Sequence, residues 1–175
     1  SESVNSLMGV KDSYVRLYCT SGYGDQPTLR RVLTEEKPDA VLHITDPRYW
    51  NWLYRMEHEI RKTIPLCYYH VWDNEPVPLY NKTIYESCDW IGCISKVTQK
   101  CVAGSCGVDN HTYIPHGVDV NTYQPLDYEA SLKCRQNILD DACDFMMLVN
   151  NANMRRKQIL STMEAFDKFC KKLKS

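Results

Sequence analysis

The chain has 175 residues, enough for one α/β domain or parts of two, and 43% of them are apolar, which is enough to form a core. Its formal net charge of -1 argues against a nucleic-acid binder, because such domains usually carry a marked basic excess. The uncharged apolar runs are all too short to form a transmembrane segment. The polar start at residues 1–6 lacks the basic and apolar parts of a signal peptide.

Short β-rich runs alternate with longer helical patterns, which predicts βαβ units. The expected strands are at 14–19, 40–44, 65–70, 90–95, 111–115 and 145–150. The expected helices are at 27–37, 47–62, 79–87, 96–103, 128–139 and from about 155 to the end. Pro27 and Pro47 suit first helical turns, and Ser95 can cap the helix that follows it. The expected fold class is α/β, with a Rossmann-like parallel sheet and flanking helices.

Nine cysteines are scattered along the chain, an odd number without the paired spacing of a zinc site. Several lie in apolar runs, where a free cysteine behaves as a small hydrophobic residue. We therefore expect reduced thiols in a cytoplasmic protein, without a bound metal or cofactor.

Residues 118–127 are polar and contain Pro125, which is typical of a crossing between two domains. We expect an N-terminal Rossmann-like domain at 1–117 and the start of a second such domain at 128–175. One strand and two helices cannot close that second domain, because a parallel sheet needs cover on both faces. The chain is therefore expected to be the central part of a longer protein.

Two segments carry the most specific pattern. The run at 113–119 reads Tyr-Ile-Pro-His-Gly-Val-Asp, and Asn-Met-Arg-Arg-Lys follows at 153–157, with Glu-Ala-Phe at 164–166. In this order the segments resemble the hinge and the phosphate-binding helix of family 4 glycosyltransferases, which have the two-domain GT-B fold. The resemblance implies a retaining transferase that moves a sugar from a nucleoside-diphosphate sugar, linked to UDP or GDP, to an acceptor.

The basic triplet Arg155, Arg156 and Lys157 stands where a helix is expected to begin. Three cations there oppose the helix dipole, so an anion is the natural missing partner. A solvated basic turn is the alternative for such a triplet taken alone. The resemblance implies that Lys157 and Arg156 are catalytic and stabilise the departing diphosphate, although Asn-Asn-Ala at 150–152 replaces the family's Gly-Arg pair.

The other expected donor-phosphate ligands are Gly117, His116, Arg155 and Asn153. Gly117 offers a backbone amide without a Cβ in the way. His116 stands where the family usually has Asn, and its alternative role is to orient the hinge. Asp119 is expected to pin the turn structurally.

His70 ends the expected strand 65–70, and the carboxyl ends of parallel strands border the ligand crevice in α/β proteins. The family has a histidine after the matching strand that contacts the donor sugar, which implies a catalytic role for His70. The alternative is a buried histidine satisfied by a backbone carbonyl. Asp73 and Asn74 follow on the same loop and are expected to bind sugar.

Asp46, Arg48 and Tyr49 follow the expected strand 40–44, and their mixture of charge and aromatic surface suits sugar binding on the acceptor side. Trp50 and Leu53 share a helix face with Ile60 and are expected in the core.

Two other functions stay open. One is a non-catalytic nucleotide- or sugar-binding module made from a truncated GT-B core, favoured because the family's acidic Glu-x7-Glu segment has no counterpart here. The other is a sugar-nucleotide epimerase, which lacks this combination of hinge and Glu-Ala-Phe. The donor sugar and the acceptor, whether glycan, lipid or protein, are not specified by the sequence.

Overall fold

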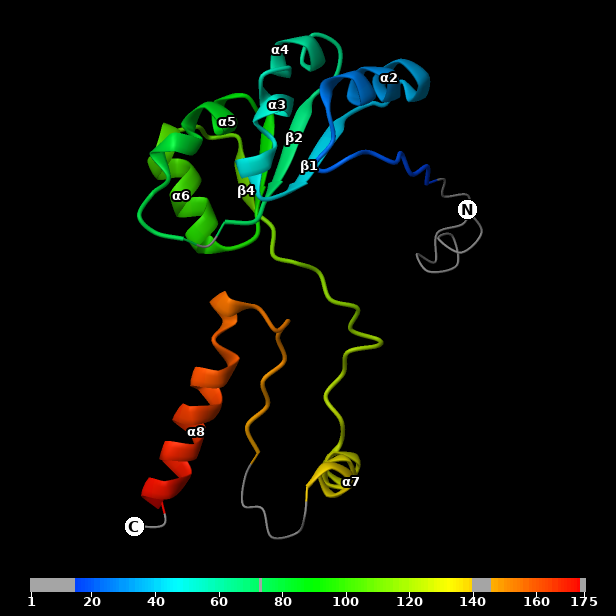
Figure 1. Cartoon of the computed structure of the whole chain (residues 1–175). Helices are drawn as coiled ribbons and strands as arrows, with labels where there is room; N and C mark the ends of the chain where they lie inside the picture. Colours follow the sequence, from blue (N-terminus) through cyan, green and yellow to red (C-terminus); the bar gives the residue numbers. More distant parts are fainter. Residues whose placement is uncertain (1–14, 73, 140–145, 174–175) are drawn as a thin grey trace. The chain divides into compact units, whose positions relative to one another are not determined.

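The structure, a computed structural model, describes residues 15–72, 74–139 and 146–173. The chain divides into two compact units, Ser1–Val118 and Asp119–Ser175 (Figure 1). The first unit contains the sheet and its helices, and the described part of the second contains the helices α7 and α8 and the short 3-10 helix η3.

A parallel sheet of four strands in the order β1-β2-β3-β4 forms the centre of the first unit (Figure 1). The strands are β1 (Val41–Thr45), β2 (Leu66–His70), β3 (Trp90–Cys93) and β4 (His111–Tyr113). The helical segments are α2 (Gln26–Glu36), η1 (Pro47–Tyr49), α3 (Asn51–Tyr54), α4 (Glu57–Ile60), η2 (Leu79–Asn81), α5 (Lys82–Glu86) and α6 (Lys96–Cys106). Parallel neighbours need a crossover, and helical segments supply each one. The expected α/β class with a Rossmann-like parallel sheet is confirmed.

Local signals in the sequence explain where the two longest helices of this unit begin and end. Asp25 caps α2 by accepting a hydrogen bond from the Thr28 amide, with a proline in the first turn. Ser95 caps α6 by accepting from the Thr98 amide, as expected. Gly107 ends α6 with φ of 66°, a left-handed conformation that glycine adopts without strain.

The helix expected at 47–62 is instead divided into η1, α3 and α4. The backbone leaves the helical conformation at Trp50 (φ -115°, ψ 17°) and at Met56 (φ -97°, ψ 3°). Met56 is 1% exposed, and Trp50 packs against the same core. The need to bury both side chains has broken the regular helical repeat.

The core lies on one face of the sheet, where Leu66, Tyr68 and His70 of β2 point inward. The buried apolar cluster contains Leu53, Tyr54, Met56, Ile60, Leu66, Tyr68, Ile84, Tyr85, Cys88, Ile91, Cys93 and Val102. Alternate residues of a strand face opposite sides, and on β1 Leu42 and Ile44 are 53% and 58% exposed. Of the expected core positions, Leu53 is confirmed as a member of this cluster, and Trp50 is partly buried and packs against it.

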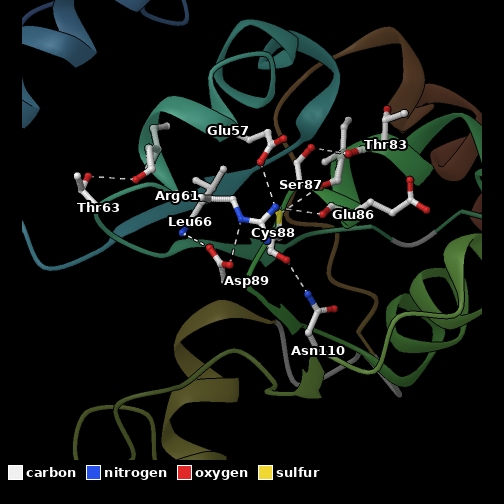
Figure 2. Close-up of polar contacts among 12 residues, drawn as sticks. Glu57, Arg61, Thr63, Leu66, Thr83, Glu86, Ser87, Cys88, Asp89 and Asn110 are labelled. Carbon is white, nitrogen blue, oxygen red and sulfur yellow. Dashed lines mark hydrogen bonds and ion pairs between the residues drawn. The ribbon is translucent and has the colours of Figure 1, made fainter.

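A polar cluster joins the amino ends of β2 and β3 (Figure 2). Asp89 accepts hydrogen bonds from the Leu66 amide at 2.8 Å and from Arg61 Nε at 3.0 Å. Arg61 also donates to Glu57 one helical turn earlier. The cluster therefore ties the end of α4 to the start of both strands.

A strand was expected at 14–19, but the described residues 15–19 do not pair with any strand of the sheet, so this prediction is wrong there. Tyr18 and Arg16 instead bind the Glu36 carboxylate at the end of α2, and Arg31 lies over the Tyr18 ring at 5.7 Å. These side-chain contacts hold the segment against α2 rather than beside β1.

The second unit contains α7 (Tyr128–Ile138), η3 (Arg155–Lys157) and α8 (Ile159–Leu173). The strand expected at 145–150 is not formed at 146–150, and residue 145 lies outside the described residues. The described part of this unit contains no strand, so residues 146–150 have no strand there to pair with through backbone hydrogen bonds. The segment contributes Met147 and Val149 to an apolar groove along α8 instead. No helix within the three described ranges is long and apolar enough to cross a membrane.

Candidate functional site

The strand register brings four carboxyl ends to one edge of the sheet. Thr45 pairs with His70, His70 with Cys93, and Cys93 with Tyr113. The segments that leave this edge carry most of the expected site residues of the first unit. The edge is therefore where a ligand of an open α/β sheet is expected.

His70 is placed at this edge but its side chain is enclosed, with 0% exposure. Its Nε2 lies 2.8 Å from the Tyr85 hydroxyl, which also accepts a hydrogen bond from Asn81 at 3.2 Å. The rings of Tyr68 and Trp72 pack beside it, at centroid distances of 4.7 and 6.0 Å. This is the arrangement of a buried structural histidine, held by a tyrosine hydroxyl rather than by a backbone carbonyl. Contact between His70 and a sugar stays a prediction and requires this packing to open.

Burial keeps the His70 imidazole neutral. Desolvation lowers its pKa to about 3, against a smaller opposing effect of the Asp46 carboxylate. Its Nδ1 has no hydrogen-bond partner among the described residues. A neutral imidazole suits hydrogen bonding inside the core, and at neutral pH it supplies no positive charge.

A second buried histidine, His43, was not singled out by the sequence. It is 5% exposed, stacks on Tyr68 at a centroid distance of 4.8 Å, and has Nδ1 2.6 Å from the Tyr54 hydroxyl. Desolvation lowers the pKa of His43 to about 4. One signal in the sequence could have indicated that His43 is buried. It lies within the otherwise apolar run 41–44, on a strand face that is buried.

Asp46, Arg48 and Tyr49 lie together where the chain leaves β1. Asp46 caps η1 by accepting from the Arg48 amide at 3.0 Å, and both of its carboxylate oxygens lie 2.9 Å from Arg48 Nε. The hydrogen bond from Arg48 is the main reason why the pKa of Asp46 is lowered. Tyr49 is 55% exposed beside this pair. The structure thus groups these three expected residues at the surface.

The loop after β2 is described only in part. Asp73 lies outside the described residues. The Asn74 side chain is exposed, and its backbone carbonyl accepts a hydrogen bond from the Trp72 indole at 3.0 Å. The Trp72 contact fixes the backbone of Asn74 and leaves its amide side chain free to reach a ligand.

His116 and Gly117 are exposed after β4. The Tyr69 hydroxyl donates to the Ile114 carbonyl at 3.0 Å and lies 3.2 Å from His116 Nδ1, which ties the exit from β4 to β2. An added Cβ at Gly117 would meet nothing within 4 Å, so packing does not require glycine there. Asp119 accepts from the amides of Asn121 and Thr122, which confirms that it pins the turn.

The basic residues of the second unit lie one turn before α8 rather than on it. Arg155, Arg156 and Lys157 form η3, and Gln158 (φ 49°) separates it from α8. Arg155 and Arg156 are exposed, Lys157 is half-buried, and none of the three forms an ion pair with a described residue. Asn153 is exposed just before them. This turn therefore offers concentrated positive charge without an ion-pair partner in the part of the chain that the structure describes.

Within the described ranges, no three side chains of His, Cys, Asp or Glu are grouped so that they could hold a metal ion. The described cysteines are all free thiols. Burial raises the pKa of Cys88 to about 12 and that of Cys93 to about 11, so both thiols stay protonated at neutral pH.

Comparison of the chain with protein-family models, with curated proteins and with solved structures finds no match.

Proposed function

We propose that the chain belongs to a two-domain GT-B glycosyltransferase, which moves a sugar from a nucleoside-diphosphate sugar to an acceptor hydroxyl with retention of configuration. The observation that carries this proposal is the basic turn Arg155–Lys157, which has no ion-pair partner in the described structure and directly precedes the amphipathic helix α8. A diphosphate supplies the anion that such a turn lacks.

In this proposal Lys157 and Arg156 offset the charge that develops on the departing diphosphate. Groups already oriented toward that charge stabilise the transition state more than the ground state, which lowers the barrier. Arg155 and Asn153, which belong to the same segment as Lys157 and Arg156, bind the donor phosphates. The acceptor hydroxyl attacks from the face that the diphosphate leaves, which retains configuration, and its proton passes to the departing diphosphate oxygen.

One observation favours a second candidate function, a non-catalytic nucleotide- or sugar-binding module. His70 is enclosed by Tyr85, Tyr68 and Trp72, so its imidazole does not reach solvent in the described structure. A module of this kind would bind nucleotide through the basic turn without transferring sugar. Turnover of a nucleotide sugar by the complete protein separates the two functions.

The direct test is calorimetric titration of the chain and of Lys157→Ala with UDP and GDP. Loss of one hydrogen bond to a charged group costs about 1.5–3 kcal/mol, so Kd is expected to rise about 10- to 100-fold. The matched control is Lys171→Ala, since Lys171 is a lysine of the adjoining helix that is paired with Asp167 at 2.6 Å and is 74% exposed. Such a surface pair contributes little, and this variant is expected to bind as the wild type does.

In an assay of sugar transfer, Lys157→Ala is expected to lower kcat by about 10²–10³ while substrate binding weakens less. Equal nucleotide affinity in the two lysine variants, at matched thermal stability, would identify residues 155–157 as a solvated basic turn and remove the main support for a transferase.

A further inference from the structure

Two exposed tyrosines from distant parts of the first unit form a parallel stack. The rings of Tyr23 and Tyr49 lie 4.5 Å apart between centroids with an interplanar angle of 5°, and the residues are 54% and 55% exposed. Tyr23 precedes α2, whereas Tyr49 ends η1 at the carboxyl edge of the sheet. The pair presents aromatic surface to solvent without being part of the core cluster.

Two glycines shape the turn that contains Tyr23. Gly22 (φ 59°) and Gly24 (φ 80°) flank it in left-handed conformations that other residues adopt only with strain. A Cβ on Gly24 would lie 3.2 Å from the Trp52 ring, a tight contact that would require a small shift of that ring. The Gly24 amide closes the turn onto the Ser21 carbonyl at 3.3 Å. In this turn the Tyr23 ring lies against the ring of Tyr49.

Polar groups that can bind hydroxyls adjoin this stack. Asp46 offers carboxylate acceptors, and Arg48, whose side chain is 63% exposed, offers guanidinium donors. The pKa of Arg48 is raised mainly by its hydrogen bond to Asp46, and Tyr49 and Tyr80 add to this electrostatically, which places both tyrosines in its surroundings. Tyr80 is itself 72% exposed.

We propose that the Tyr23–Tyr49 stack and the Asp46–Arg48 pair together bind one ring of a neutral saccharide, which serves as the acceptor of the proposed transferase. The apolar C–H face of a sugar ring packs against an aromatic ring, and its hydroxyls both donate to a carboxylate and accept from a guanidinium. Because Asp46 and Arg48 neutralise each other, the site carries no net charge to select an anion. Only the role as acceptor rests on the proposed function, because binding of the saccharide requires no nucleotide.

The test is titration of the full chain, without nucleotide, with the methyl glycosides of glucose, mannose and galactose, followed by NMR of the tyrosine rings. At least one glycoside is expected to shift the Tyr23 and Tyr49 signals. Tyr49→Ala is expected to weaken binding about two- to tenfold, and Tyr49→Phe, which keeps the ring, to bind nearly as the wild type does.

The matched control is Tyr128→Ala on α7, where a tyrosine that is 75% exposed is removed from the other unit; glycoside binding is expected to be unchanged. Thermal unfolding of each variant checks that the fold is kept. Failure of all three glycosides to bind, equal binding by Tyr49→Ala, or displacement of these signals by UMP or GMP instead would overturn the saccharide assignment. The nucleotide result for Lys157 would stand unaffected, so the two proposals fail independently.

Discussion

Acidification should destabilise the first unit well above the pH at which carboxylates titrate. His43 and His70 are buried as neutral imidazoles, with pKa values lowered to about 4 and about 3, mainly by desolvation. In the unfolded chain both return to a pKa of about 6.5. As the pH falls below that value the unfolded state binds protons first, so stability is fully present above it and is lost toward the folded pKa values.

The magnitude follows from the proton count. One pKa unit corresponds to about 1.36 kcal/mol, so between pH 6.5 and pH 5 two histidines together remove up to about 4 kcal/mol of unfolding free energy. Typical domains have only about 5–15 kcal/mol in total. Carboxylates with lowered pKa values, such as Asp46 and Asp25, lose their stabilisation only at lower pH. The loss of unfolding free energy between pH 6.5 and pH 5 therefore reports on the two histidines rather than on these carboxylates.

The assay is urea unfolding at half-unit steps from pH 7.5 to pH 5, followed by tryptophan fluorescence. His70→Phe is expected to lower stability at pH 7.5, because the Tyr85 hydroxyl loses its hydrogen bond to His70 Nε2, and to halve the slope of stability against pH. His58→Ala, which changes an exposed histidine of α4, should keep the wild-type slope. An unchanged slope in His70→Phe, or stability that rises on acidification, would refute this reasoning.

Two further predictions concern the scaffold. Asp89→Ala removes the hydrogen bonds from the Leu66 amide and from Arg61, and is expected to lower the free energy of unfolding in urea by about 1.5–3 kcal/mol. Asp89→Asn keeps an acceptor for the Leu66 amide and should lower it less, and equal losses in the two variants would contradict the role of that amide. Ser95→Ala removes the cap of α6 and should cost about 1 kcal/mol, and Ser95→Gly only a few tenths, by the same assay.

Local chemistry in the sequence was enough to predict the alternation of strands and helices. The proline of the first turn and the Ser95 cap mark helix starts directly, because they satisfy backbone groups within a few residues. The four strands that form pair with one another in a single sheet. The segments at 15–19 and 146–150 have the composition of strands but make no ladder, since composition cannot supply a hydrogen-bonded neighbour.

Part of the candidate site was also readable from the sequence. A single turn brings together Asp46, Arg48 and Tyr49, because they lie within four positions of the chain. The basic triplet 155–157 likewise lies in one short segment. Tyr23 was not singled out, because its stacking on Tyr49 joins segments that are far apart in the chain.

The sequence by itself determined the α/β class, the helix caps, the turn pinned by Asp119 and the positions of concentrated charge, since each depends on residues close together in the chain. Only the tertiary structure decided that His70 and His43 are buried and neutral, and that Tyr23 meets Tyr49. The physical reason is that burial and stacking depend on which distant side chains exclude water from a group, and that is set by the packing of helices on the sheet.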